Sequence, residues 1–243
     1  MALIHNSNIV RNGLVLHLDA ANRKSYSGSG TTWFDLSGRN NTCTLFNSPT
    51  FSSNSFVFDG LNDHMSLTNA NTFAWTPQGS IGNSTFSIEF WIRTSDNDGN
   101  FISKPWNGGG GYNYIVSTSG FTLAPVTINF QLGANIGFAS SLNDNIVHQV
   151  VIWANGTNFG YYIDGVKTVG SAAHGFTADN PGGNPNSQIG LTIMSLYPYG
   201  EGWAGNNSFS IQGQLFNLKF YNRVLTSLEV VQNFNSIRDR YGI

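Results

Sequence analysis

The 243-residue sequence contains one cysteine, Cys43, so it can form neither an intrachain disulfide nor a cluster of cysteine metal ligands. Any fold must therefore be held by packing and hydrogen bonds. Charged residues make up only 10% of the chain, against about 25% in an ordinary soluble protein. The net charge of −2 offers no cluster of Lys and Arg such as nucleic-acid binding requires, so we expect no nucleic-acid partner.

Long apolar runs are also missing. No stretch approaches the roughly 20 apolar residues of a membrane-spanning helix, and no basic amphipathic segment suits a membrane surface. The first residues, MALIHNSNIVRNG, lack the basic start and continuous apolar run of a secretory signal. We therefore expect a chain made in a cytoplasm and not inserted into a membrane. Its richness in Asn, Ser, Thr and Gly is nevertheless typical of proteins that act outside cells, and release from a lysed host would account for both features.

What the sequence does contain is alternation of apolar and polar residues with a period of two, which predicts β-strands. In STFSIEFWIRT, one strand face carries Phe86, Ile88, Phe90 and Ile92, and the other carries Ser87, Glu89, Trp91 and Arg93. Further strands are predicted at Gly13–Asp19, Ser55–Phe58, His64–Leu67, Tyr112–Ser117, Val126–Gln131 and Gln188–Ile193, with three more between 148 and 170, separated by turns at Asn155-Gly156 and Asp164-Gly165.

The run from Phe209 to Tyr221 changes the parity of its apolar residues, which predicts a bulge near Gly213. Beyond that bulge the apolar face is expected to hold Phe216, Leu218 and Phe220.

One helix is predicted, over 227–238. Thr226 and Glu229 form a capping box, and the apolar residues that follow recur at helical spacing: Leu228, Val231, Phe234 and Ile237. The sequence shows no linker and no repeat. It therefore predicts an all-β, two-sheet antiparallel sandwich over 13–243, closed by this helix, after a polar arm at 1–12 whose ordering would need a partner.

Catalytic residues are hard to find. A sandwich enzyme that cleaves polysaccharide needs two carboxyl groups about 5–9 Å apart, and two on one strand face would stand at i and i+2. The chain has three glutamates, Glu89, Glu201 and Glu229, and no carboxylate lies two residues from Glu89. We therefore expect no enzyme and no catalytic residue, and Glu89 is the one anchor for a depolymerase.

Acidic turns raise the question of calcium. FDGLNDHMSL places Asp59 and Asp63 between two strands, where two carboxylates and loop carbonyls could bind calcium. The alternative is an Asp-Gly turn in which the carboxylates bond to their own backbone. SDNDGN, at 95–100, resembles the start of a calcium loop, but position 12 is Asn107 instead of a glutamate. No cofactor is required by either motif.

Two loops, KPWNGGGGYNY and SLYPYGEGWAG, combine glycine with aromatic residues. Aromatic faces beside amide donors suit sugar rings, but the same side chains can pin loops onto the sandwich or fill a subunit interface. All three interpretations remain open for the candidate carbohydrate- or partner-binding residues Trp106, Tyr112, Tyr114, Tyr197, Tyr199 and Trp203.

The block GLVLHLDAANRKSYSGSGTTWFDLSGRNNT contains a histidine and two aspartates but completes no catalytic set. His17 and Asp19 are expected on the outward face of the first strand, and Trp33 in the core. Asp19 and Asp35 are expected to form turns through bonds to the backbone.

Several segments together resemble laminin-G-like domains of the concanavalin A-like lectin/glucanase superfamily. FSIEFWIRT carries the strand tryptophan Trp91, the hairpin Y-x-D-G is formed by Tyr162, Asp164 and Gly165, and YNRVLTSLE runs from Tyr221 to Glu229. The resemblance extends from about Gly13 to Ile243 and implies a jelly-roll sandwich. The closely spaced acidic residues of the glucanase branch are missing.

The opening block, followed by FVFDGLNDHMSL, is similar to a subgroup found among structural proteins of tailed bacteriophages. This resemblance implies a virion surface protein that decorates the capsid or forms part of a tail or fibre. Its implied partners are capsid or tail subunits and copies of itself. A lectin-like adhesin that binds host-surface polysaccharide is the alternative, because fold alone does not assign function.

Overall fold

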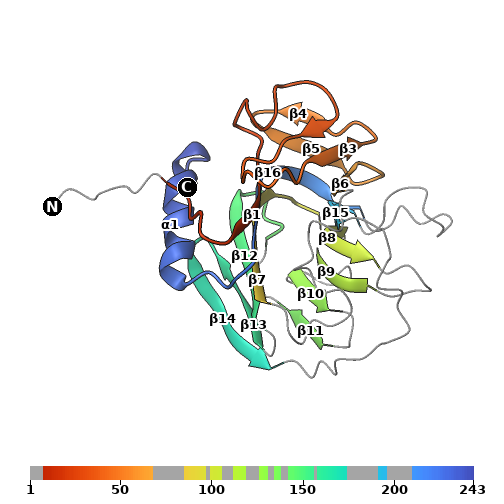
Figure 1. Cartoon of the computed structure of the whole chain (residues 1–243). Coiled ribbons are helices and arrows are strands. Elements are labelled where there is room, and N and C mark those ends of the chain that lie inside the picture. The colour runs from red at the N-terminus through yellow and green to blue at the C-terminus, as the bar shows by residue number, and fades with distance from the viewer. Residues whose placement is uncertain are drawn as a thin grey trace.

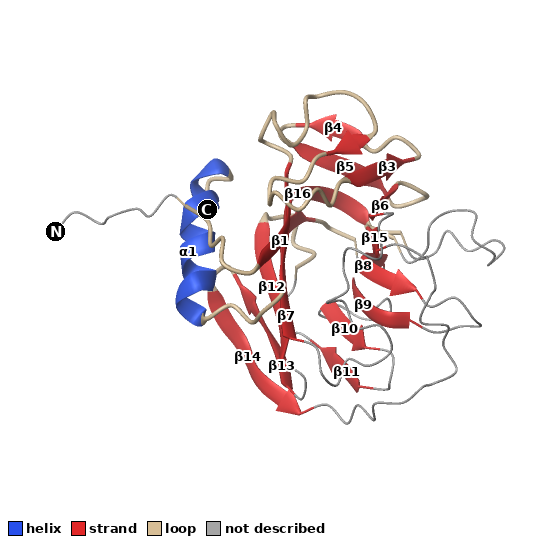
Figure 2. Cartoon of the chain, in the orientation of Figure 1, coloured by secondary structure: helices blue, strands red, loops and turns tan. Residues whose placement is uncertain are grey.

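Figure 1 shows a computed structural model of the chain, which describes residues 8–67, 85–96, 99–105, 112–118, 126–130, 134–137, 142–155, 158–173, 191–195 and 210–243. These residues form two antiparallel sheets packed face to face, with one short α-helix near the C-terminus (Figures 1 and 2). The sandwich and the C-terminal helix predicted from the alternation are therefore confirmed.

The first sheet, called sheet A here, has the strand order β14-β13-β12-β7-β16-β5-β4, and β1 pairs with β16 beside β5. Its strands are β1 (Leu14–Asp19), β4 (Thr50–Ser52), β5 (Ser55–Asp59), β7 (Thr85–Arg93), β12 (His148–Asn155), β13 (Asn158–Ile163), β14 (Val166–Ala173) and β16 (Gln212–Tyr221).

The second sheet, sheet B, has the strand order β11-β10-β9-β8-β15-β6-β3-β2. Its strands are β2 (Thr32–Trp33), β3 (Cys43–Phe46), β6 (His64–Leu67), β8 (Gly99–Pro105), β9 (Tyr112–Thr118), β10 (Val126–Phe130), β11 (Ala134–Gly137) and β15 (Leu191–Ile193).

Aromatic side chains fill the space between the sheets. Trp33 of sheet B meets Phe56 of sheet A with ring centroids 4.7 Å apart, and Phe90 meets Phe101 across the sandwich at 5.6 Å. All four are at most 1% exposed. Each buried side chain of this size contributes roughly 1.5–3 kcal/mol, so these contacts hold the two sheets together without a disulfide.

Strand β7 is buried on both faces because the core covers one and helix α1 (Ser227–Ile237) covers the other (Figure 2). The predicted core face of Phe86, Ile88, Phe90 and Ile92 is confirmed. On the opposite face, Trp91 packs on the helix, with its ring stacked 5.7 Å from that of Phe234.

Strand β16 contains a bulge, but at Phe216 instead of near Gly213. Phe216 is the extra residue between the pairs Leu215–Ile92 and Asn217–Trp91.

This bulge sends Phe216 to the helix side, where it packs on Trp91 and Ile237. Leu218 and Phe220 point into the core. The prediction that Phe216 shares their face is therefore wrong.

Helix α1 begins as predicted at the capping box, in which the Glu229 N–H donates to the Thr226 Oγ1 at 3.3 Å. Its buried face, however, consists of Val230, Asn233 and Ile237. Of the predicted apolar face, Ile237 is buried and Phe234 packs on Trp91, but Leu228 is 82% exposed and Val231 is also exposed. The prediction is therefore wrong for the first half of the helix. A short 3-10 helix, η3 (Arg238–Arg240), follows. No helix in the described part of the chain is long and apolar enough to cross a membrane.

The part of the predicted arm that the structure describes, residues 8–12, lies against the fold. Gln232 donates to the Asn8 carbonyl at 2.8 Å, and Arg223 donates to the Asn12 carbonyl at 3.0 Å. Val10 is buried. This segment is therefore ordered by its own chain.

Candidate functional site

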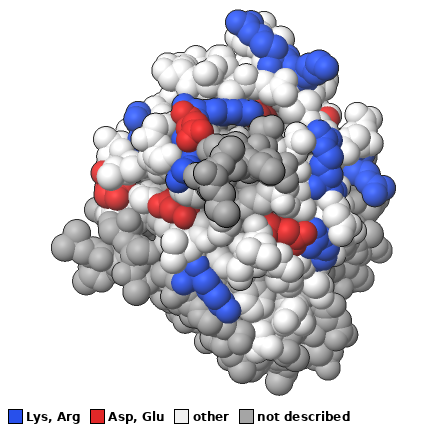
Figure 3. Space-filling view, turned by 90° about the vertical axis from the view of Figure 1, so that its left-hand side faces the viewer, with Lys and Arg blue, Asp and Glu red and all other residues white. Residues whose placement is uncertain are grey.

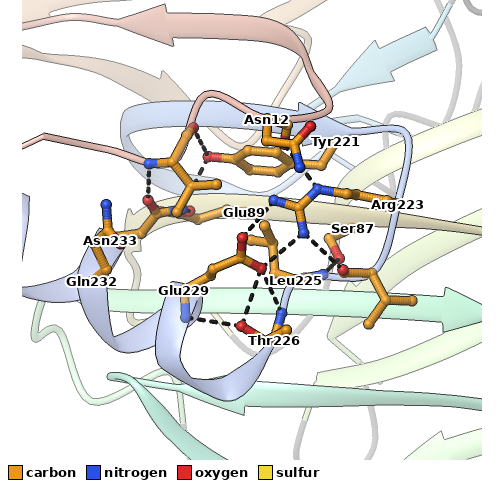
Figure 4. Close-up of polar contacts among 12 residues, drawn as sticks. Asn12, Ser87, Glu89, Tyr221, Arg223, Leu225, Thr226, Glu229, Gln232 and Asn233 are labelled. Carbon is orange, nitrogen blue, oxygen red and sulfur yellow. Dashed lines mark hydrogen bonds and ion pairs between the residues drawn. The ribbon is translucent and has the colours of Figure 1, made fainter.

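The outer face of sheet A carries a cluster of polar side chains beneath helix α1, centred on Glu89. Figure 4 shows Glu89 with Asn233 and Tyr221 from this cluster. Lys219, from the neighbouring strand β16, places its Nζ 2.8 Å from the Glu89 Oε1, and both side chains are fully buried. Trp91 Nε1 and Gln149 Nε2 each donate to the same oxygen at 3.1 Å. The helix supplies the Asn233 Nδ2, which donates to the Glu89 Oε2 at 2.6 Å.

Asn233 extends this cluster to the N-terminal segment. Its Nδ2 also donates to the Tyr221 hydroxyl at 2.9 Å, and its Oδ1 accepts the Val10 N–H at 2.8 Å. The Tyr221 hydroxyl donates to the Val10 carbonyl at 3.2 Å. Figure 4 shows these bonds joining the sheet, the helix and the N-terminal segment at one point.

The charge of Glu89 is stabilised despite its burial. Burial alone would raise the pKa of this carboxyl, but the Lys219 charge and the hydrogen bonds from Lys219, Gln149 and Trp91 lower it. Removing one partner of such a buried pair leaves the other charge uncompensated, which destabilises a protein by about 3–5 kcal/mol. The role that this geometry gives to Glu89 is to hold α1 on the sheet.

This placement bears on the depolymerase interpretation. Glu89 is the glutamate that the sequence offers as an anchor, but it is 0% exposed and its two oxygens accept hydrogen bonds from four side chains. A glycoside-cleaving carboxyl must contact the scissile bond. In this structure Glu89 cannot reach a polysaccharide in solvent.

Glu229 is also committed to structure. Its carboxylate accepts two hydrogen bonds from Arg223, at 2.6 and 2.8 Å, and one from the Thr226 N–H at 2.9 Å. The Arg223 bonds, with those from Thr226, lower the pKa of this carboxyl to about 2. Glu201 lies outside the described residues.

The calcium candidates Asp59 and Asp63 lie in the turn between β5 and β6. The Asp59 Oδ1 accepts the N–H groups of Leu61 at 2.8 Å and Asn62 at 3.3 Å, while the Asp63 Oδ2 accepts the Asp59 N–H at 3.3 Å. Burial and the neighbouring Asp59 charge raise the pKa of Asp63. These bonds are those of the Asp-Gly turn alternative, and the described residues contain no group of three or more His, Cys, Asp or Glu placed to hold a metal.

The opening block folds as a strand and two turns. Asp19 Oδ1 accepts the Ala21 N–H at 3.1 Å, and Asp35 Oδ1 accepts the Ser37 N–H at 2.8 Å, so both predicted turns are present. Trp33 is fully buried in the core. Asp19 faces away from the core as expected, but it is buried there because the C-terminal segment covers it, and it pairs with Arg240 at 2.8 Å.

Only two of the six aromatic candidates lie in strands that the structure describes. Tyr112 and Tyr114 lie in β9, opposite Pro105 and Lys104 of β8, but their side chains are outside the described set. The predictions for the other four, Trp106, Tyr197, Tyr199 and Trp203, fall wholly outside the described residues.

The sequence interpretation missed the partners of Glu89. Lys219 could have indicated them from the sequence, because a lysine inside the apolar strand FNLKFY requires a buried counter-charge. It also missed His148, whose ring nitrogens lie 2.8 Å from Asp164 and 3.2 Å from Asp144.

On the helix side of the molecule, Figure 3 shows charges of both signs scattered over a largely uncharged surface.

A family model described as the concanavalin A-like lectin/glucanases superfamily, of laminin-G type, matches residues 59–231. The chain belongs to this superfamily. The match includes the Trp91 strand, the Asp164-Gly165 hairpin and the start of α1, and it agrees with the jelly-roll sandwich described above. No curated protein sequence matches the chain.

Solved structures share the fold of this superfamily member at low sequence identity. Trypanosoma rangeli sialidase in complex with sialic acid aligns at 15% identity with a TM-score of 0.68, over 95% of this chain and 34% of the sialidase. The binding domain of botulinum neurotoxin DC, in complex with rat synaptotagmin II, aligns at 16% and 0.62, over 94% of this chain and 52% of that one. The chain thus spans about a third of the sialidase and half of the toxin domain.

A third structure is close to this chain in size. Domain 4 of AbnA, an extracellular GH43 arabinanase from Geobacillus stearothermophilus, in complex with arabinotriose, aligns at 11% identity and a TM-score of 0.61. The alignment covers 90% of this chain and 97% of that domain. At these identities, the three structures show the fold alone.

Proposed function

We propose that this chain is a non-enzymatic virion structural protein of a tailed bacteriophage, a surface-exposed jelly-roll module that decorates the capsid or forms part of the tail or fibre. The observation that carries the proposal is the opening block, whose resemblance to phage structural proteins lies in residues that form β1, β2 and their turns. The structural use of Glu89 supports a role without hydrolysis.

The proposed partners are capsid or tail subunits and further copies of this chain, because virion sites repeat by symmetry. The sandwich would act as a rigid platform on the particle. The test is mass spectrometry of purified virions, followed by cryo-electron microscopy to place the protein. We expect a fixed stoichiometry relative to the major capsid or tail protein, and absence from purified particles would refute the proposal.

A second candidate function is binding of cell-surface glycan through the aromatic loops. It is favoured by the arabinotriose complex of the arabinanase domain, a protein of nearly the same extent and fold. Glycan-array binding by the full chain, lost on replacing Trp106 and Trp203 with alanine, would support it. Binding that survives both replacements would exclude these loops as the site.

A further inference from the structure

The outer face of sheet A continues beyond the end of α1 into an open pocket of about 480 Å³. Tyr241, which follows the helix, packs on Trp91 with ring centroids 5.3 Å apart, and Arg93 is the next residue on that face of β7. The C-terminal segment therefore covers this face as far as Trp91, and the pocket begins where that cover ends.

Four side chains form a row across the pocket because their strands are in register. Thr50 pairs with Val57, Val57 with Gln214, and Gln214 with Arg93, so the row crosses β4, β5, β16 and β7. At about 4.8 Å between neighbouring strands, it extends over roughly 14 Å.

The walls of the pocket are fixed by hydrogen bonds. On one side, Thr94 Oγ1 donates to the Gln212 carbonyl, and Asp96 Oδ2 accepts the Gln212 N–H at 2.8 Å. On the other side stands the Asp59–Asp63 turn with its internal bonds. The floor is close-packed at Gly213, where a Cβ would lie 2.8 Å from the Arg93 carbonyl oxygen. The pocket is therefore pre-formed.

The polar groups that line the pocket have hydrogen-bonding capacity to spare. The side chains of Arg93, Gln212 and Gln214 make no hydrogen bond or ion pair with the described residues, although Arg93 and Gln214 are half-buried. Asp59 is exposed, and its Oδ2 accepts no bond within the described chain. Guanidinium and amide donors thus stand beside carboxylate and amide acceptors.

This mixture selects among ligand classes. Two carboxylates against one guanidinium disfavour a phosphate or another anion. Val57 is the one apolar member of the row, and a purely apolar ligand would leave the polar side chains around it unpaired. Hydroxyl groups both donate and accept, so a ligand rich in them can use both kinds of group at once. The raised pKa of Asp63, caused by burial and by Asp59, brings the pocket closer to neutrality.

We propose that this pocket binds a neutral saccharide along the Thr50–Val57–Gln214–Arg93 row, with Arg93, Gln214 and Asp59 bonding its hydroxyl groups. The site is built on strands and uses no aromatic stacking, so it is distinct from the aromatic loops of the second candidate function. It does not depend on the virion assignment.

The experiment screens the full chain on an array of neutral and acidic oligosaccharides. Each neutral hit is then titrated by calorimetry against the wild type, Arg93→Ala and Gln214→Ala. The matched control is Arg39→Ala, an exposed arginine on a loop outside the pocket. Thermal unfolding of every variant verifies that it is folded.

We expect Arg93→Ala to weaken binding about tenfold or more and Gln214→Ala about threefold to tenfold, while Arg39→Ala leaves it unchanged. Binding that is unaffected by both pocket variants but abolished by Trp106→Ala and Trp203→Ala would overturn the pocket and support the loops. An array without any neutral hit would also overturn it, and neither result would bear on the presence of the protein in virions.

Discussion

Glu89 and Arg93 stand on the same face of the same strand, four residues apart, yet they have opposite surroundings. Glu89 lies under α1, pairs with Lys219 and is sealed from solvent. Arg93 lies beyond the C-terminal segment, in a pocket, and its side chain makes no hydrogen bond or ion pair with the described residues. Their partners on β16, Lys219 and Gln214, differ in the same way.

Polar residues on a strand face therefore do not by themselves indicate a binding surface. Under the helix, Glu89, Lys219 and Asn233 bond to one another and attach the helix to the sheet. Beyond it, similar residues keep their hydrogen-bonding capacity for a ligand. The part of the face that α1 covers is structural, and the part that it leaves open can bind a ligand, although both parts carry similar residue types.

The largest effect should come from breaking the covered part. Glu89→Gln leaves the buried Lys219 charge without its counter-charge, and we expect a loss of about 3–5 kcal/mol in the free energy of unfolding. Urea denaturation followed by tryptophan fluorescence measures it.

A matched control replaces both partners at once, as Glu89→Leu with Lys219→Met. Because no charge is then left unpaired, we expect this double variant to be more stable than Glu89→Gln. A loss below about 1 kcal/mol for Glu89→Gln would contradict the proposed structural role of Glu89, which joins Lys219 of β16 to Asn233 of α1.

A smaller effect is expected at the start of the covering helix. Thr226→Ala removes the acceptor for the Glu229 N–H, which costs about 1 kcal/mol in comparable helices. Ser236→Ala, near the other end of the helix, is the control for substitution on α1 itself. Urea midpoints would contradict the capping role if Thr226→Ala were no less stable than Ser236→Ala.

Two histidines of sheet A, His17 of β1 and His148 of β12, should titrate with opposite signs. Burial, and then the Lys219 charge, lower the pKa of His17 to about 4, so stability should fall as the pH drops from about 6.5 towards 4. The hydrogen bond to Asp164 raises the pKa of His148. Its contribution should be complete below pH 6.5 and should disappear as the pH rises through the folded-state pKa.

Thermal unfolding between pH 4 and 8 distinguishes the contribution of His17 to stability from that of His148. We expect His17→Gln to reduce the loss of stability on the acid side, and the deficit of His148→Gln to be largest below about pH 6.5. Parallel curves for wild type and both variants would show that neither histidine is linked to folding.

The smallest effect on stability belongs to Arg93→Ala, which we expect to change the free energy of unfolding by less than about 0.5 kcal/mol. The side chain has no partner in the described chain to lose. The same variant should weaken saccharide binding. A loss of binding without a loss of stability would show that Arg93 serves a ligand and not the fold. A stability loss similar to that of Glu89→Gln would erase the contrast between the two parts of the face.

The sequence predicted most of the strands, the capping box and the core face of β7 because each depends on local spacing. It did not predict β2, β3, β4, β8 or β11. It placed the bulge of β16 near Gly213 instead of at Phe216, since the register of a strand is fixed by its neighbour. It misjudged part of the buried side of α1 because Asn233, a polar residue, belongs to the buried face with Val230 and Ile237.

The sites were predicted less well. Asp59 and Asp63 were found from sequence as a turn that could hold calcium, and the turn geometry is what the structure shows. The pocket row could not be found in this way, because Val57, Gln214 and Arg93 meet only through strand pairing across long sequence separations. Thr50 joins them through the short β4–β5 hairpin.

The bonds from residues 8–12 to α1 and Arg223 have a consequence for how the domain can be carried. They bring the N-terminal segment to the side of the sandwich occupied by the C-terminal helix (Figure 1). A domain whose two ends emerge together can be inserted into a loop of another protein, or tethered at one side, without strain on its sheets. Sheet B and its connections would then point away from the point of attachment.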